Sequence, residues 1–169
     1  MLDKMVNLIV DCIKSGGKVL TFGVGGNAAN AIHFAAELAG KYEKYETPLP
    51  CIDLVSNVSV LTAITNDFGW EHVFERQIQS LAKPGDVVMA FSISTDGEYL
   101  RNALLEAYDC KCSSILICGE NTLPLNQPEW RWKVDCLWEL GSLNTPKIQE
   151  KQLGIIHRLC LSVKSRMGG

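Results

Sequence analysis

Short apolar runs alternate with amphipathic segments along the chain, and this alternation constrains the fold more than any other feature. The apolar runs are too short to be helices and indicate buried strands, whereas the longer segments space their apolar residues as helices do. The predicted strands cover residues 18–22, 50–54, 87–92, 114–118 and 134–137. The predicted helices cover residues 1–14, 28–42, 59–65, 73–81, 96–107 and 145–165. Strands that are apolar throughout are typical of a parallel sheet covered on both faces. We expect one α/β domain over residues 1–169, a three-layer sandwich with a central parallel sheet.

Charge and composition exclude several classes of protein. A chain of 169 residues with a net charge of -3 is long enough for a core and lacks the basic face of a nucleic-acid-binding protein. No apolar run approaches the roughly 20 residues that span a membrane, and the first residues lack the pattern of a signal peptide. Most of the seven cysteines lie in apolar segments, which indicates reduced thiols. We expect no nucleic-acid partner, no membrane and a cytoplasmic location.

Four polar residues on two predicted helices carry most of the chemistry. His33 and Glu37 are four residues apart and share a helix face, and Gln149 and His157, eight apart, share another. If the two helices pack together, two imidazoles, a carboxylate and an amide converge. Such a set can bind a transition metal or transfer protons to a small substrate. A buried structural hydrogen-bond network is the alternative.

Two loops follow predicted strands at the edge of the sheet where ligands bind in such folds. Residues 23–26 (Gly-Val-Gly-Gly) allow a close approach of the backbone to an anion, although their spacing is not that of a dinucleotide-binding loop. Residues 92–97 offer hydroxyls and amides for a phosphate. Asp96 and Glu98 suit the dipole of the following helix but would repel a phosphate. In both loops, a turn or a capped helix without a ligand remains the alternative.

Several motifs, in order, resemble the SIS (sugar isomerase) domain family, and within it the phosphoheptose isomerases. The family's glycine loop and the helix after it are matched by residues 23–28 and by His-Phe-Ala-Ala-Glu-Leu at 33–38. Further matches are Leu-Thr-Ala-Ile-Thr-Asn-Asp-Phe-Gly at 61–69, Val-Phe-Glu-Arg-Gln at 73–77, Lys-Ile-Gln-Glu at 147–150 and Ile-Ile-His-Arg-Leu-Cys at 155–160. The likeness covers nearly the whole chain.

The resemblance implies a flavodoxin-like sandwich, usually a homotetramer with active sites between subunits. It implies conversion of a ketose phosphate, such as sedoheptulose 7-phosphate, to the aldose phosphate through an enediol, with Glu37 and His157 as base and acid. Some members bind zinc through positions that here are His33, Glu37, Gln149 and His157. The positions it assigns to substrate binding are Gly25, Gly26, Asn27, Asn66, Asp67, Ser92, Ser94, Asp96 and Gln149.

The sequence departs from the family pattern mainly around the substrate. Val24 and Asn27 replace Asn and Ser of the glycine loop, and the phosphate loop Ser-Thr-Ser-Gly-Asn-Ser reads Ser-Ile-Ser-Thr-Asp-Gly at 92–97. Lys41 and Lys147 replace arginines and lose the bidentate fork. We also expect the family's N-terminal helix to be short or missing. These changes argue against a standard heptose phosphate site.

Two other functions stay open beside a phosphoheptose isomerase. One is a non-catalytic SIS protein that binds a sugar phosphate or regulates other proteins, favoured by the altered loop. Trp130, Trp132 and Trp138, which we expect to pack against a neighbouring surface, also favour it. The other is an isomerase for a modified sugar. His72, in a polar stretch, is expected to take no part in any of them.

Overall fold

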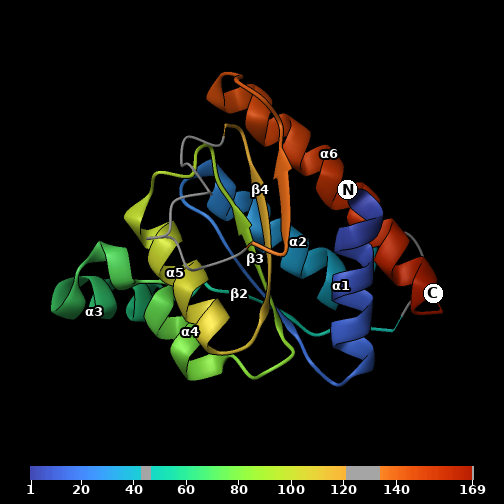
Figure 1. Ribbon diagram of the computed structural model, residues 1–169, viewed down its shortest axis with the longest axis horizontal. Coiled ribbons are helices and arrows are strands. Elements are labelled where there is room, and N and C mark those ends of the chain that lie inside the picture. The colour runs from blue at the N-terminus through green and yellow to red at the C-terminus, as the bar shows by residue number, and fades with distance from the viewer. Residues whose placement is uncertain (43–46, 121–133, 169) are drawn as a thin grey trace.

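The computed structural model of the protein describes residues 1–42, 47–120 and 134–168 (Figure 1). Five parallel strands form one sheet in the order β2-β1-β3-β4-β5. The strands are β1 (Val19–Phe22), β2 (Cys51–Asp53), β3 (Val87–Phe91), β4 (Ser113–Cys118) and β5 (Cys136–Glu139). The parallel sheet is confirmed, and its order is that of flavodoxin-like folds.

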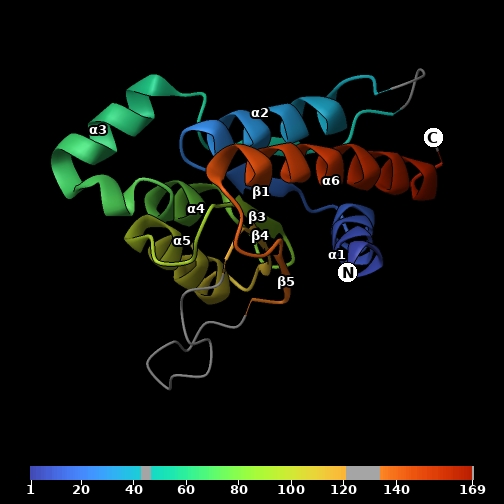
Figure 2. The same ribbon diagram turned by 90° about the horizontal axis from the view of Figure 1, so that it is seen from above.

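Helices cover both faces of the sheet, which completes the three layers (Figures 1 and 2). The helices are α1 (Leu2–Lys14), α2 (Gly26–Ala39), α3 (Val58–Phe68), α4 (Glu75–Leu81), α5 (Glu98–Asp109) and α6 (Thr145–Arg166), with a 3-10 turn η1 (Trp70–His72). One core lies between the sheet and α1, α2 and α6, where Phe34 meets Phe91 edge to face. A second core lies between the sheet and η1, α4 and α5, where Phe22 stacks on Phe74.

The sequence explains where the long helix α6 begins and which side it buries. The side chain of Asn144 accepts a hydrogen bond from the amide of Lys147 at 3.2 Å, and Pro146 occupies the first turn, where its missing N–H costs nothing. Ile148, Ile155, Ile156 and other residues at helical spacing are buried against the sheet and α2. Each such side chain contributes about 1.5–3 kcal/mol by leaving water.

Three local differences from the sequence prediction have simple causes. The predicted helix 73–81 starts two residues late, at Glu75, because the separate turn η1 precedes it after Gly69, whose φ is 95°. β2 is partly exposed, with Ile52 41% accessible, because it forms an edge of the sheet. The last strand begins at Cys136, two residues later than predicted.

α3 projects from the three layers and touches the second core through the partly buried Leu61 and Ile64. Figure 2 places it at the end of the molecule where α2 and α6 begin. None of its residues is buried, although Val58 and Phe68 are apolar. Among the described residues, no helix is long and apolar enough to cross a membrane.

Candidate active site

The sheet order places the two predicted loops side by side. β1 and β3 are neighbours whose chains leave the sheet in opposite directions along the order, and ligands bind at such switch points in open α/β sheets. The glycine loop follows β1, and residues 92–97 follow β3. The structure therefore places both loops at this edge of the sheet, and ligand binding there stays a prediction.

The glycine loop makes a tight turn into α2. Gly25, at a φ of 61°, is the residue before the helix, in a conformation that side chains disfavour. A Cβ on Gly26 would overlap the side-chain amide of Gln149, so glycine at this position lets α6 approach the start of α2. Asn27 is buried, and its Oδ1 has no hydrogen-bond partner among the described residues.

Two serine hydroxyls of the loop after β3 are bonded within the loop. The hydroxyl of Ser92 donates to the carbonyl of Ser94 at 2.6 Å, and the hydroxyl of Ser94 donates to the Asp96 carboxylate. The Asp96 side chain is exposed, and Glu98 lies in the first turn of α5, where Arg101 pairs with it at 2.5 Å. In this state, two of the loop's hydroxyls are engaged, one of them by the exposed carboxylate of Asp96.

His33 from α2 and His157 from α6 meet at the seam between the two helices. Their Nε2 atoms lie 3.1 Å apart, within hydrogen-bond distance, so one ring donates to the other. Glu37 follows His33 by one turn, and its Oε1 lies 3.5 Å from the Nε2 of His33. The side chains of His33 and Glu37 are 39% and 21% exposed, so the group opens to solvent instead of lying in the core. This partial exposure disfavours the buried structural network.

Gln149, the fourth predicted member, lies against a different part of α2. Its amide faces Gly26, which precedes His33 by seven residues, or about 10 Å of helix rise. Among the described residues, no hydrogen bond joins this amide to either imidazole. The structure thus brings together His33, Glu37 and His157, and the place of Gln149 beside them stays a prediction.

The donors at the seam fit zinc in type and partly in spacing. Two nitrogens bound to one tetrahedral zinc ion lie about 3.3 Å apart, close to the observed 3.1 Å. The Glu37 carboxylate pairs with His33 alone, and no group of three or more His, Cys, Asp or Glu side chains in the described part of the chain is already arranged to hold a metal. The imidazole pair is therefore placed for metal binding, whereas the carboxylate must turn to complete the set.

Asn66 and Asp67, predicted to bind substrate, lie near the end of α3. Both are exposed, and the Asn66 amide donates to the Asp67 carboxylate at 2.8 Å. Among the described residues, no hydrogen bond or ion pair joins either side chain to His33 or His157. Their role stays a prediction. Trp138 is half-buried on β5, whereas Trp130 and Trp132 lie outside the described residues.

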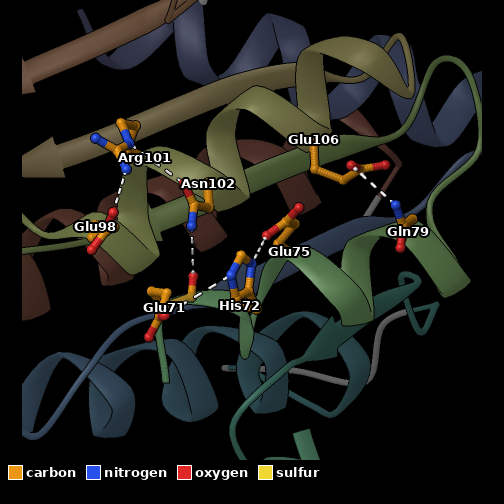
Figure 3. Close-up of polar contacts among 8 residues, drawn as sticks. All are labelled: Glu71, His72, Glu75, Gln79, Glu98, Arg101, Asn102 and Glu106. Carbon is orange, nitrogen blue, oxygen red and sulfur yellow. Dashed lines mark hydrogen bonds and ion pairs between the residues drawn. The ribbon is translucent and has the colours of Figure 1, made fainter. Parts of the chain in front are cut away.

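His72 belongs to a separate polar cluster on the other face of the sheet (Figure 3). Its Nδ1 lies 2.5 Å from Oε2 of Glu75, and its Nε2 lies 4.0 Å from Glu71. The side chain of Asn102 donates to the Glu71 carbonyl at 3.1 Å, and Gln79 on α4 reaches Glu106 on α5. These contacts fasten α5 to η1 and α4.

Sequence reasoning missed a buried amide pair beneath the seam. Gln152 is fully buried and accepts a hydrogen bond from the Nδ2 of Asn30 at 3.0 Å. The available signal was an amide among the apolar residues of α6, four after Ile148 and three before Ile155. An amide in that position must find buried partners.

Comparisons with known proteins identify the family. Residues 1–119 match the SIS domain family. The chain is 38% identical to the phosphoheptose isomerase of Geotalea daltonii over 165 residues, which is 98% of this chain and 83% of that protein. The chain belongs to the phosphoheptose isomerases of the SIS domain family. Solved phosphoheptose isomerases from Neisseria gonorrhoeae and Francisella tularensis align with TM-scores of 0.85 and 0.87, at 31% and 30% identity. Each alignment covers 97% of this chain and 85% of the other.

The likeness to the phosphoheptose isomerases includes the two helices that form the α2–α6 seam. The relatives align across both helices, so the likeness includes the segments that carry His33, Glu37 and His157. Family and fold are thereby settled, and the chain is that of an isomerase. The roles of the individual residues stay predictions.

Proposed function

We propose that the protein interconverts a ketose phosphate and an aldose phosphate, with sedoheptulose 7-phosphate as the leading substrate. The observation that carries this proposal is the contact of His33 and His157 beside Glu37. These residues lie on α2, which begins at the switch point, and on α6, whose start packs against that of α2. The names of relatives that align over nearly the whole chain support the reaction. They also favour an enzyme over a non-catalytic binding protein.

The isomerisation needs two proton transfers on each side of an enediol. In the ketose-to-aldose direction, Glu37 removes a proton from C1 while His157 donates one to the carbonyl oxygen on C2. Glu37 then returns a proton to C2, and His157 takes the proton of the C1 hydroxyl, which becomes the aldehyde. Positioned acids and bases of this kind contribute about 10²–10⁴-fold each to a rate. His33, between the two groups, orients both.

We propose zinc as the metal of this site, held by His33, Glu37 and His157, with Gln149 as a fourth ligand after its side chain turns. Bound zinc polarises the carbonyl and hydroxyl oxygens of the substrate. The 3.1 Å separation of the two Nε2 atoms supports this assignment. One oxygen of the Glu37 carboxylate could bind the metal while the other accepts a proton. His157 would act as the acid only while its Nε2 carries a proton instead of the metal.

The substrate's phosphate is proposed to bind at residues 92–97, with Gly25, Gly26 and Asn27 contacting the sugar. Ser92 and Ser94 become donors once their present hydrogen bonds to Ser94 and Asp96 open. The buried, unpartnered Oδ1 of Asn27 supports a polar ligand near the start of α2. Asp96 opposes a dianion by its charge, so binding is expected to be weaker than in a loop without this residue.

We propose a homotetramer in which a neighbouring copy completes each site. The exposed apolar side chains of Ile32, Leu153 and Leu161 lie on α2 and α6, which form the half-open seam. α3 buries none of its residues within the chain, so a second copy would give its apolar side chains, and Asn66 and Asp67, a surface to contact. A cytoplasmic location is also proposed, since all seven cysteines are free thiols.

A phosphoketose panel tests the proposed activity. Purified protein with added zinc is incubated with sedoheptulose 7-phosphate, ribulose 5-phosphate and fructose 6-phosphate, and aldose formation is followed by the anomeric proton signals in NMR. We expect turnover of the seven-carbon substrate and none of unphosphorylated sedoheptulose. Turnover of another ketose alone would indicate a modified or different sugar. A protein inert toward the whole panel would contradict the isomerase and favour the binding role.

A further inference from the structure

The buried amides of Gln152 and Asn30 connect three parts of the molecule that the proposed reaction uses together. Gln152 lies on α6, five residues before His157, and Asn30 lies on α2, three residues before His33. The Oε1 of Gln152 accepts from the Nδ2 of Asn30 at 3.0 Å, and the same Nδ2 lies 3.4 Å from the carbonyl of Gln149. This pair fixes the register of the two helices just before the histidines meet.

The other end of Gln152 reaches the sheet. Its Nε2 donates to the carbonyl of Ser92 at 2.9 Å and to the carbonyl of Ile117 at 3.2 Å. Both carbonyls lie at the carboxyl end of the sheet, and Ser92 is the first residue of the loop at 92–97. Every hydrogen-bonding hydrogen of this side-chain amide is therefore engaged, and the side chain is fully buried.

We infer that Gln152, through Asn30, is a positioning residue that sets the distance between the proton-transfer group at the seam and the loop at 92–97. A single amide is bonded to α2, to the loop after β3 and to β4, and these bonds leave it no second arrangement without a buried, unpaired group. A substrate held at the loop must present its carbonyl to Glu37 and His157. A shift of either anchor by about 1 Å lowers the rate by as much as 100-fold. This inference rests on the proposed function.

Gln77 offers a matched control. It is 7% exposed, lies on α4 against the other face of the sheet, and its Nε2 donates to two backbone carbonyls, of Leu54 at 3.0 Å and Val73 at 2.9 Å. Gln77→Met and Gln152→Met each remove a buried amide with two carbonyl acceptors and keep the length of the side chain. Gln77 is bonded to neither α2 nor α6. Gln77→Met therefore shows what the loss of a buried amide does to the stability of the protein when the proposed site is not displaced.

The test compares Gln152→Met, Asn30→Leu and Gln77→Met in the full chain with zinc. We expect all three to lower the denaturant midpoint, with Gln77→Met keeping kcat and KM within twofold of the unaltered protein. Gln152→Met should lower kcat at least tenfold and raise KM severalfold, because it releases both helices and the loop. Asn30→Leu removes only the link between the helices, so it should lower kcat and leave KM nearly unchanged. If Gln152→Met does not fold, Asn30→Leu still tests the inference through a lower kcat at a nearly unchanged KM.

A second readout does not require turnover. The ring ¹H–¹³C NMR signals of His33 and His157 should move in Gln152→Met and Asn30→Leu and stay in place in Gln77→Met. Kinetics and ring signals that match those of Gln77→Met in both other variants would overturn the inference and leave Gln152 a packing residue. An unaltered protein without turnover would instead contradict the proposed function, and the ring signals would still decide the positioning role.

Discussion

Each face of the sheet carries a histidine beside carboxylates, and the two groups differ in what brings them together. His33 and His72 have equally exposed side chains, 39% in both cases, and each has a glutamate partner within 4 Å. His72 finds Glu75 three residues away, on the turn and helix that follow directly. His33 finds His157, 124 residues away, on a helix from the other end of the chain. Residue type and exposure do not distinguish the two groups, whereas convergence beside the switch point does.

The largest effect on kcat is expected from replacing a histidine of the seam, compared with the same replacement on the opposite face of the sheet. His157→Gln removes the proposed acid at the seam and should lower kcat by about 10²–10⁴-fold. His72→Gln removes an equally polar ring that pairs with Glu75 and Glu71 and should change kcat less than twofold. Steady-state kinetics of both purified variants measures the difference. Equal losses in the two variants would mean that the seam has no special role.

The second prediction compares the zinc content of variants on the two faces of the sheet. His33→Ala removes one of two imidazoles with the spacing of zinc ligands, so bound zinc should fall more than tenfold, measured by elemental analysis after dialysis against a weak chelator. Glu75→Gln alters the cluster on the opposite face and should leave the zinc content unchanged. Zinc retained in His33→Ala and lost in Glu75→Gln would place the metal on the wrong face for the proposed site.

A smaller effect is expected at the loop that follows β3. Asp96→Ser removes the carboxylate that accepts the Ser94 hydroxyl and frees that hydroxyl for a phosphate. KM for the phosphorylated substrate should fall about five- to tenfold, more strongly at low salt, because screening weakens the repulsion. Glu106→Gln on α5 removes one negative charge farther along the helix and serves as the control. An unchanged KM in Asp96→Ser would show that Asp96 points away from the bound phosphate.

The smallest effect concerns the thiols. Burial and the nearby Glu106 raise the pKa of Cys110 to about 11, and burial and Asp86 raise the pKa of Cys112 to about 12. Because a raised pKa keeps the thiol protonated, little thiolate is present at pH 7–8, and it increases about tenfold per pH unit until pH approaches these values. Alkylation by iodoacetamide, followed by mass spectrometry, should therefore be slow at pH 7.5. Fast labelling of either thiol would contradict this environment.

The fold was largely predictable because its signals are local. Apolar runs at 19–22 and 87–91 gave fully buried strands, and the glycines at 25 and 26 gave the turn into α2. Edge position and element boundaries were less predictable. The partial exposure of β2 follows from the strand order, which no local run of residues contains.

The site was predictable only in part. Helical spacing identified His33 and Glu37, which share one face of α2, and His157, which shares a face of α6 with Gln149. It could not find the contact of Gln149 with Gly26, because that depends on how closely α6 approaches the start of α2. It also missed Gln152, whose partners lie 122, 60 and 35 residues away along the chain. Hydrogen bonds between residues that are far apart along the chain follow no regular spacing, so the sequence alone does not reveal them.

Proton exchange at the substrate tests the central claim most directly. The zinc-loaded protein is incubated with sedoheptulose 7-phosphate in heavy water, and deuterium incorporation next to the carbonyl is followed by NMR, with Glu37→Gln in parallel and Glu75→Gln as the control. The account predicts incorporation by the unaltered protein and by Glu75→Gln, and none by Glu37→Gln. Incorporation that continues at the full rate in Glu37→Gln would contradict the account, because the base would then lie elsewhere.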